Sequence, residues 1–336
     1  MNICIISGFK EKPDEGMKIF ASKISEELSK SNDVLHINAK ENIFSFHFWL
    51  RLRKFNPQII HLFLRLTPAT MTLLMIFGYC CKNSKLVVSV LQPPEKMSIL
   101  KVIFTFFKPD VILTQSSETE KKFIELDCKT GFLPSGVDTE KFRPVDEGIK
   151  KELRRKHGIS ESKFVVLHVG HINEGRNLEI FKDIRDLNGG IEVIIIGSTN
   201  EFNFNRQIYD DLLNAGIYAK REFYENIEEF YQLSDCYVFP TIDSSFAIEI
   251  PLSVLEAMGC NLPVISTKFG GLSRIIMNDN DIIFVDSTDD INNAIHQIRL
   301  RQSQIESRDV VLNYSWKNIA HNLDAIYQDI SITKVV

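Results

Sequence analysis

Short β-branched runs alternate with segments of helical period along almost the whole chain. In the first half these runs include "NICIIS" (2–7), "QIIHLFL" (58–64) and "KLVVSV" (85–90), and in the second half "KFVVLHVG" (163–170) and "IEVIIIG" (191–197). Such alternation is typical of βαβ units, whose parallel strands are joined by right-handed helical crossovers. Continuous apolar strands also indicate sheets that are covered on both faces.

Two series of this kind predict an α/β chain with two doubly wound, Rossmann-like domains. Its 336 residues exceed the size of one typical domain. The stretch "LPSGVDTEKFRPVDEG" (133–148) is rich in proline, glycine and charge and shows no period, so we place the domain boundary there. The other predicted strands are 33–38, 110–115, 236–240, 262–267 and 281–286.

Composition and charge exclude several classes of protein. With 44% hydrophobic and 25% charged residues the chain is typical of a soluble globular protein, and its net charge of −5 gives no reason to expect nucleic-acid binding. Six cysteines without a CxxC spacing indicate reduced thiols in a cytoplasmic protein. The N-terminus lacks a basic region before its apolar run, and the apolar stretch 66–81 is too short to span a bilayer.

Signatures of common cofactors are absent from the sequence. The residues after the first strand, "SGFKEKPDEG", do not form GxGxxG, and neither GxxxxGK[ST] nor HExxH occurs. "DND" (279–281) has the spelling of a metal-binding DxD, but its position between a helix and a strand favours a turn. We therefore expect no cofactor and no metal.

The first candidate binding place follows the strand 163–170. Gly170 and Gly175 allow a close backbone turn in "GHINEGRN", and Arg176 supplies a fixed cation near the next helix. Doubly wound folds bind ligands beyond the carboxyl ends of their strands, so this loop suits a diphosphate. The alternative is a capped loop with a solvated arginine.

The second candidate place is the helix that begins in "EIPLSVLEAMG". Pro251 is expected at the first helical position, where it leaves three backbone amides free for an anion, those of Leu252, Ser253 and Val254. Glu256 follows Ser253 by three residues on the same helical face, so its carboxylate can accept two hydrogen bonds from a ribose diol. The alternative for Glu256 is an ordinary solvated helix position.

With these places in view, four segments resemble the signatures of the family-4 retaining glycosyltransferases, which have the two-domain GT-B architecture. The resemblance extends from about residue 110 to 330. The segments are "FLPSGVDTEKFRP" (132–144), "VGHINEGRN" (169–177), "LEAMGCNLPVISTKFGG" (255–271) and "YSWKNIAHNLDAIY" (314–327).

This resemblance implies a role for each domain. Residues 1–144, with a closing helix at 315–331, would form the acceptor-side domain, and residues 145–314 would bind a nucleotide-diphospho-sugar. Glu256 would bind the ribose and Arg176, in place of the usual lysine, the diphosphate. The reaction would transfer a hexose with retention of anomeric configuration and without a metal.

The chain also departs from the family pattern on the sugar and phosphate side. The usual first glutamate of Glu-x7-Glu is Ile248, and the carboxylate is Glu249, one residue later. Glu249 is our candidate for contacting the donor sugar, with a solvated loop acid as the alternative. His171 replaces the usual arginine of the donor loop, and Arg274 replaces an acid.

Two more departures lie in the first domain. Gln92 stands where the family often has a histidine near the sugar, and Gly16 remains from a glycine pair. Both are assigned to the acceptor side of the cleft. Because these changes cluster, a catalytically degenerate nucleotide-sugar binder or partner subunit of the same fold is the alternative function. A nucleotide-sugar epimerase would need an acid and a base facing the sugar, and no such pair is visible.

If the chain is a glycosyltransferase, its acceptor would be a glycan, a lipid-linked molecule or a small molecule. The segments 43–55 and 97–108 are aromatic and basic, and we interpret them as amphipathic helices of the core. The alternative is loose contact with the inner face of a membrane and a lipid-linked acceptor.

Overall fold

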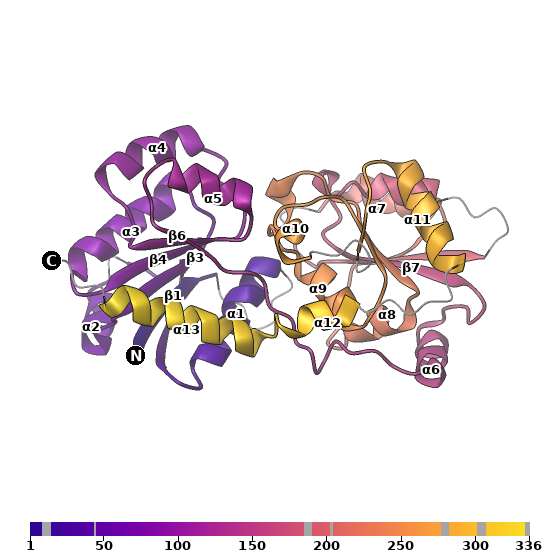
Figure 1. Ribbon diagram of the computed structural model, residues 1–336, viewed down its shortest axis with the longest axis horizontal. Coiled ribbons are helices and arrows are strands. Elements are labelled where there is room, and N and C mark those ends of the chain that lie inside the picture. Colours follow the sequence, from indigo (N-terminus) through magenta and orange to yellow (C-terminus); the bar gives the residue numbers. More distant parts are fainter. Residues whose placement is uncertain are drawn as a thin grey trace. The chain divides into compact units, whose positions relative to one another are not determined.

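The computed structural model describes residues 1–8, 15–43, 45–184, 190–201, 204–276, 282–300 and 307–332. The chain divides into two units, each built around one parallel sheet (Figure 1). The first unit contains Met1–Ser135, Ile248–Ile250 and the C-terminal segment from Trp316; the second contains Gly136–Ala247 and Pro251–Ser315. The division thus falls before residue 144, and three residues from the second half of the chain join the first unit.

The first unit has a six-stranded sheet in the order β2-β1-β3-β4-β5-β6. Every neighbouring pair is parallel, as the alternating sequence pattern predicts. The strands are β1 Asn2–Ser7, β2 Asp33–Asn38, β3 Ile59–Phe63, β4 Lys85–Val90, β5 Val111–Thr114 and β6 Thr130–Phe132. The edge strand β6 has three residues and was not predicted.

Helices cover both faces of this sheet. In Figure 1, α1 and α13 lie on one side of the strands, and α3 and α4 lie on the other. The helices are α1 Gly16–Leu28, α2 Phe46–Phe55, α3 Pro68–Cys80, α4 Met97–Phe106, α5 Ser117–Ile124 and α13 Trp316–Ile332.

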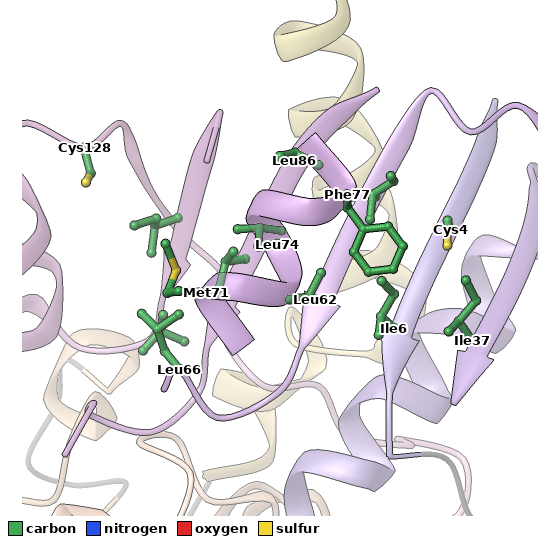
Figure 2. Packing of buried hydrophobic residues seen from close by; sticks show 14 of the residues in the cluster. Cys4, Ile6, Ile37, Leu62, Leu66, Met71, Leu74, Phe77, Leu86 and Cys128 are labelled. Carbon is green, nitrogen blue, oxygen red and sulfur yellow. The ribbon is translucent and has the colours of Figure 1, made fainter. Parts of the chain in front are cut away.

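Alternation along the strands separates the two layers of the first core. Ile60 and Leu62 of β3 pack with the inner residues of α2, α3 and α4. Figure 2 shows Leu74 and Phe77 pointing from α3 toward the strands. His61, between Ile60 and Leu62, belongs to the other face, where its Nδ1 lies 2.5 Å from the Tyr327 hydroxyl of α13. The segments 43–55 and 97–108 therefore do contribute core helices.

The second unit has a six-stranded parallel sheet in the order β12-β11-β10-β7-β8-β9. From β7, successive strands extend the sheet first in one direction and then, from β10, in the other. This is the strand order of dinucleotide-binding Rossmann folds. The strands are β7 Phe164–Gly170, β8 Ile191–Gly197, β9 Tyr218–Lys220, β10 Cys236–Phe239, β11 Val264–Ser266 and β12 Ile282–Phe284.

The helices of the second unit are shorter on average, and three are single 3₁₀ segments. They are α6 Glu147–His157, η1 Glu174–Arg176, η2 Leu178–Asp183, α7 Arg206–Asn214, α8 Glu228–Leu233, η3 Ser244–Phe246, α9 Leu252–Gly259, α10 Leu272–Ile275, α11 Thr288–Leu300 and α12 Ser307–Leu312. A core of β-branched strand residues with α7, η2 and α11 fills one face of the sheet.

The cysteines are free thiols, as their spacing predicts, and four of the six are buried. Among the described residues, no helix combines the length and the apolar character that crossing a bilayer requires.

Candidate functional site

The second sheet changes direction between β7 and β10, which are neighbours although six helices and strands separate them in sequence. Open α/β sheets bind ligands at such a switch point, beyond the carboxyl ends of the strands. There β7 ends at Gly170, and the loop that carries His171 and Arg176 follows. The end of β10 leads through Pro240 into Thr241.

Arg176 is buried at this switch point, with 7% of its surface exposed. Its guanidinium lies 5.7 Å from the centroid of the Phe239 ring, at the end of β10. A Cβ at Gly170 would lie 3.0 Å from Arg176 Nη1, so glycine there gives the side chain its room. Burial lowers the pKa of Arg176 to about 10, which still leaves it charged at neutral pH.

This cation is not neutralised by the surrounding described residues. Arg176 Nε is buried and has no hydrogen-bond partner there, and no carboxylate forms an ion pair with its guanidinium. Burying an unpaired charge is costly, so proteins pair such groups or use them for a ligand. The structure therefore excludes the alternative of a solvated arginine and leaves a site that suits an anion.

Other polar atoms without partners gather at the same strand ends. Both side-chain polar atoms of Asn173, and the hydroxyl of Thr241, are buried and lack a hydrogen bond within the described part of the chain. Asn177 Nδ2 donates to Pro240 O across 3.4 Å and so links the two loops. Buried unsatisfied groups are rare in native proteins, and a cluster of them indicates a place where a polar ligand supplies the partners.

His168 is close to this cluster but is not a second cation. Its Nδ1 donates to Val238 O at 2.9 Å, and its buried Nε2 lies 3.2 Å from where a Cβ at Gly170 would be. Burial lowers the pKa of His168 to about 3, so the ring is neutral. His171, the next histidine, is half-buried in the loop directly after β7.

The helix α9 differs in one detail from the sequence expectation. Pro251 is its N-cap, with helical residues beginning at Leu252. The amide of Val254 donates to Pro251 O at 3.2 Å, so the prediction of a free Val254 amide was wrong. The amides of Leu252 and Ser253 make no hydrogen bond to another described residue, because both lie in the first turn.

Ser253 and Glu256 do share one face of α9, and two tyrosines hold that face. The Ser253 hydroxyl lies 2.8 Å from the Tyr237 hydroxyl, and Tyr231 donates to Glu256 Oε2 at 2.7 Å. The two tyrosine rings lie 5.8 Å apart, with both side chains in the core. Glu256 is half-buried, so the alternative of an ordinary solvated position does not describe it.

Electrostatics connect Glu256 and Arg176 to the same tyrosine, Tyr237. Burial raises the pKa of Glu256 to about 7, although the hydrogen bond from Tyr231 and the charge of Lys141 lower it. Burial raises the pKa of Tyr237, and the nearby positive charge of Arg176 lowers it. The two candidate places of the sequence are therefore neighbours, and the carboxylate changes its charge near neutral pH.

Glu249 lies in the first unit and has 2% of its surface exposed, so the alternative of a solvated loop acid is wrong. Its Oε1 accepts from Ser116 Oγ at 2.7 Å and from Thr119 Oγ1 at 2.6 Å, at the N-terminus of α5. Its backbone amide donates to Leu91 O at 2.8 Å. Only Oε2, which is buried and has no partner among the described residues, is left for another ligand.

The two acceptor-side candidates also lie in the first unit. Gly16 begins α1, and a Cβ there would lie 3.3 Å from the side chain of Ile248. Gln92 follows β4, and its Oε1 accepts from Arg65 Nε at 2.9 Å.

Four residues of the second unit's site were missed by the sequence reasoning: Asn173, Tyr231, Tyr237 and Thr241. Thr241 had a usable signal, because it follows a predicted strand at its carboxyl end. The tyrosines had none, because their partners on α9 are distant in sequence. Among the described residues no group of three His, Cys, Asp or Glu side chains is arranged to hold a metal. The segment "DND" (279–281), for which the sequence predicts a turn, lies outside these residues.

Comparison with known proteins relates the site to a family. The glycosyl transferases group 1 family matches residues 149–315. Sulfoquinovosyl transferase SQD2 of Arabidopsis thaliana is 25% identical over 178 residues, which are 52% of this chain and 34% of that protein. D-inositol 3-phosphate glycosyltransferase of Paenarthrobacter aurescens is 28% identical over 165 residues, 46% of this chain and 38% of that protein. The matched part thus spans between a third and two fifths of these relatives.

Solved structures resemble the chain over almost its full length. The Anabaena Alr3699/HepE complex with UDP-glucose has a TM-score of 0.77 at 13% identity, covering 97% of this chain and 99% of that one. Sucrose-phosphate synthase from Thermosynechococcus elongatus has a TM-score of 0.77 at 14% identity, covering 99% of both chains. This likeness shows the fold, a GT-B architecture of two Rossmann-like units. Residues 149–315, which carry the Arg176 loop and Glu256, match the glycosyl transferases group 1 family.

Proposed function

We propose that the protein is a retaining glycosyltransferase that transfers a hexose from a nucleotide-diphospho-sugar to an acceptor without a metal. The observation that carries this proposal is Arg176, a buried cation at the switch point of the second sheet that no carboxylate of the described residues neutralises. A diphosphate is the ligand whose charge and position suit such a place.

The arrangement of α9 supports the same ligand. The free amides of Leu252 and Ser253 can donate to phosphate oxygens, while Glu256 Oε1 and Oε2 can accept from a ribose diol. Tyr231 orients the Glu256 carboxylate from one side. Asn173 and Thr241 supply polar atoms that a phosphate or a sugar hydroxyl would satisfy.

The proposed chemistry uses these charges in the transition state. As the bond between sugar and diphosphate breaks, negative charge develops on the leaving phosphate oxygens. A fixed guanidinium and backbone amides stabilise that charge without reorganising at the moment of reaction. Arg176 would therefore take the place that a divalent cation has in metal-dependent transferases.

The relatives support the donor class. Anabaena Alr3699/HepE, which has the same fold, was solved with UDP-glucose and with UDP. The relatives matched in sequence include a sulfoquinovosyl transferase and a D-inositol 3-phosphate glycosyltransferase. We assign the first unit, with Gly16 and Gln92, to the acceptor, and residues Gly170, His171, Arg176, Leu252, Ser253 and Glu256 to the donor.

A panel of nucleoside diphosphates and nucleotide sugars tests the donor assignment. We expect one nucleotide class to raise the thermal unfolding temperature of the wild-type protein, and Arg176→Ala to abolish the shift. With the matching nucleotide sugar, slow release of nucleoside diphosphate should continue in the presence of a chelator. Loss of release on chelation would contradict metal independence, and the absence of any stabilising nucleotide would contradict the proposal.

A second candidate is a nucleotide-sugar binder without catalysis. The observation that favours it is Glu249, the shifted carboxylate, whose Oε1 is engaged by Ser116 and Thr119 of the first unit. If Glu249 serves only to hold its own chain segment, the sugar side of the site lacks an acid. Tight binding of a nucleotide sugar with no turnover, even with cell-extract acceptors, would decide for the binder.

A further inference from the structure

The solvent side of three helices in the first unit carries large apolar side chains. We call this surface the outer helical face; it is formed by α2, α3 and α4. Its apolar members expose between 38% and 83% of their surface. They are Phe46, Leu50, Met75, Tyr79, Ile99, Val102 and Phe106.

These helices form one continuous layer. The Phe77 ring of α3 lies 6.1 Å from Phe48 and 5.7 Å from Trp49, both of α2. On its other side, a Cβ at Gly78 would lie 3.1 Å from Phe107, directly after α4. Figure 2 shows the inner side of this layer, where α3 turns Leu74 and Phe77 toward the sheet. The apolar residues of the outer helical face therefore do not belong to the hydrophobic core of this unit.

The charge of this region is opposite to that of the rest of the chain. Residues 42–109 contain nine lysines and arginines and a single acid, Glu95, which is a net charge of +8 in a chain of net charge −5. The remaining residues thus carry −13. No aspartate or glutamate occurs in α2, α3 or α4.

Most of these cations are not neutralised. Arg51, Arg65, Lys85 and Lys108 form ion pairs. The other five have none within the described ranges, and all five are exposed: Arg53, Lys54, Lys82, Lys96 and Lys101. Positive charges thus lie beside the exposed apolar residues on each of the three helices or at their ends.

A hollow of about 700 Å³ opens between the C-terminal ends of α2 and α3. Its lining combines the aromatic side chains of Trp49 and Tyr79 with the cations Arg53 and Lys82. Lys82 Nζ lies 5.5 Å from the Tyr79 ring centroid. The hollow lies beside the amino ends of β3 and β4. Ligands of this fold bind at the opposite edge of the sheet, beyond the carboxyl ends of the strands.

We propose that the outer helical face docks on the surface of a membrane that contains anionic lipids. Aromatic and aliphatic side chains enter the boundary between headgroups and acyl chains, and unpaired cations bind the negative headgroups. The hollow between α2 and α3 offers Arg53 and Lys82 to one headgroup phosphate. This docking does not depend on the proposed transferase activity.

Charge distinguishes a membrane from a second copy of the chain as the occupant. Two copies joined through this face would bring two regions of the same positive sign together, which is unfavourable. An anionic bilayer offers both the complementary charge and an apolar layer beneath it. Because none of the described helices can span a bilayer, the contact is at the surface.

Vesicle flotation tests the proposal with the full chain. We expect the wild type to float with vesicles of phosphatidylcholine and phosphatidylglycerol (7:3), to stay in solution with phosphatidylcholine alone, and to be released by high salt. Tyr79→Ser with Phe106→Ser should weaken binding more than ten-fold. Lys82→Gln with Lys101→Gln should weaken it about five-fold for each cation removed.

Matched variants in the second unit are the controls. Leu300→Ser removes an apolar side chain that is 81% exposed, and Lys151→Gln removes an exposed cation. Both should float like the wild type. Since all substituted residues are exposed, the thermal unfolding temperature should remain unchanged in each variant.

A label at Cys80 gives an independent measurement. Cys80 is the exposed thiol among the six and ends α3 on the outer helical face, whereas burial raises the pKa of Cys81 to about 11. An environment-sensitive fluorophore on Cys80 in a Cys81→Ser background should shift to the blue on adding anionic vesicles. No flotation of the wild type, or equal flotation of the Tyr79 and Phe106 variant, would overturn the proposal. Self-association that this variant abolishes would identify a second copy as the occupant.

Discussion

In both sheets the carboxyl ends of parallel strands form one edge, but the polar groups at the two edges differ in whether they have hydrogen-bond partners. At the carboxyl ends of β4 and β5, the segment Ile248–Ile250 supplies partners: Ile250 N donates to Gln115 Oε1, and Ser135 Oγ donates to Ile250 O. At the ends of β7 and β10, buried polar atoms of Arg176 and Asn173 have no partner in the described structure. The first edge is completed by the protein itself, and the second is complementary to a ligand.

This difference separates residues that stabilise from residues that bind. A carboxylate whose hydrogen bonds are made within its own unit affects folding when it is removed. A buried cation without a counter-charge costs stability in the free protein and returns it when an anion binds. Variants at the two edges should therefore change different measurements.

The largest effect is expected at the first edge. Glu249→Ala leaves the hydroxyls of Ser116 and Thr119 without their buried acceptor, which should lower the stability of the first unit by about 3 kcal/mol. Both tryptophans of the chain, Trp49 and Trp316, lie in this unit, so urea unfolding followed by tryptophan fluorescence measures it selectively.

Glu249→Gln is the matched control for that experiment. Burial raises the pKa of Glu249, which favours a neutral carboxyl that glutamine resembles, so we expect a loss of no more than about 1 kcal/mol. Unchanged stability in Glu249→Ala would show that the segment is held by its backbone alone. It would return Glu249 to a role at the sugar.

The next effect is expected at the second edge. Arg176→Ala should lower the affinity for the nucleoside diphosphate at least about 100-fold, and the affinity for the bare nucleoside far less, because the lost bonds are to phosphate. Isothermal titration calorimetry with both ligands measures the difference. The free protein should not be destabilised, because an unpaired buried charge has been removed.

Arg155→Ala removes an exposed arginine of the same unit and is the control for general charge. It should leave both affinities unchanged. An equal loss of affinity for diphosphate and nucleoside in Arg176→Ala would mean that the residue acts through the structure of the loop. Both edges would then be completed by the protein itself, and the proposed difference between them would be wrong.

A smaller effect is expected at Glu256. Glu256→Gln should weaken nucleoside-diphosphate binding about 10- to 100-fold, because a neutral amide accepts less strongly from a diol. With a pKa of about 7 in the free protein, the wild type should also bind about ten-fold more tightly at pH 8 than at pH 6. The sign follows because the ionised carboxylate is the better acceptor.

The same titration links pH to stability. The folded carboxyl of Glu256 keeps its proton to higher pH than the unfolded one, so its contribution to stability falls as the pH rises from about 4.5 to 7. Glu256→Gln should flatten both pH profiles. A wild-type affinity for the nucleoside diphosphate that is the same at pH 6 and at pH 8 would remove Glu256 from the ribose site.

The smallest effect is expected at Thr241. Thr241→Val keeps the shape of the side chain and removes a hydroxyl that has no partner in the described structure. We expect donor affinity to fall about five-fold, the value of one neutral hydrogen bond, while the stability of the free protein stays equal or rises. A loss of stability in the free protein would show that the hydroxyl has a structural partner.

Local pattern was sufficient to predict most of the fold. The strands that became β1, β4 and β8 were placed by their apolar runs, and the helix from Gly16 by its period. The strands β6 and β9 were missed because their residues, TGF and YAK, contain no run of β-branched residues, whereas such runs marked the equally short β11 and β12. The segment Ile248–Ile250 was assigned to the second domain because no local signal marks its transfer to the first unit.

The site was predicted in part for the same reason. Arg176 and Glu256 belong to loops and helix starts that follow strands, so their sequence positions indicated a place at a strand end. Tyr231, Tyr237 and the acceptor role of Glu249 toward Ser116 depend on partners far away in sequence. The amide of Val254 was misjudged because a 3₁₀-type bond closes the first turn of α9.

The sequence by itself determined which segments are strands and helices, and which cation and carboxylate stand at their ends. Those properties depend on residues a few positions apart, whose spacing sets the faces of each element. Only the tertiary structure decided the strand order of each sheet, because the same series of βαβ units is compatible with several orders. It also decided that Glu249 accepts from hydroxyls at the N-terminus of α5 while Arg176 has no ion pair within the described ranges, since such partners are set by long-range packing.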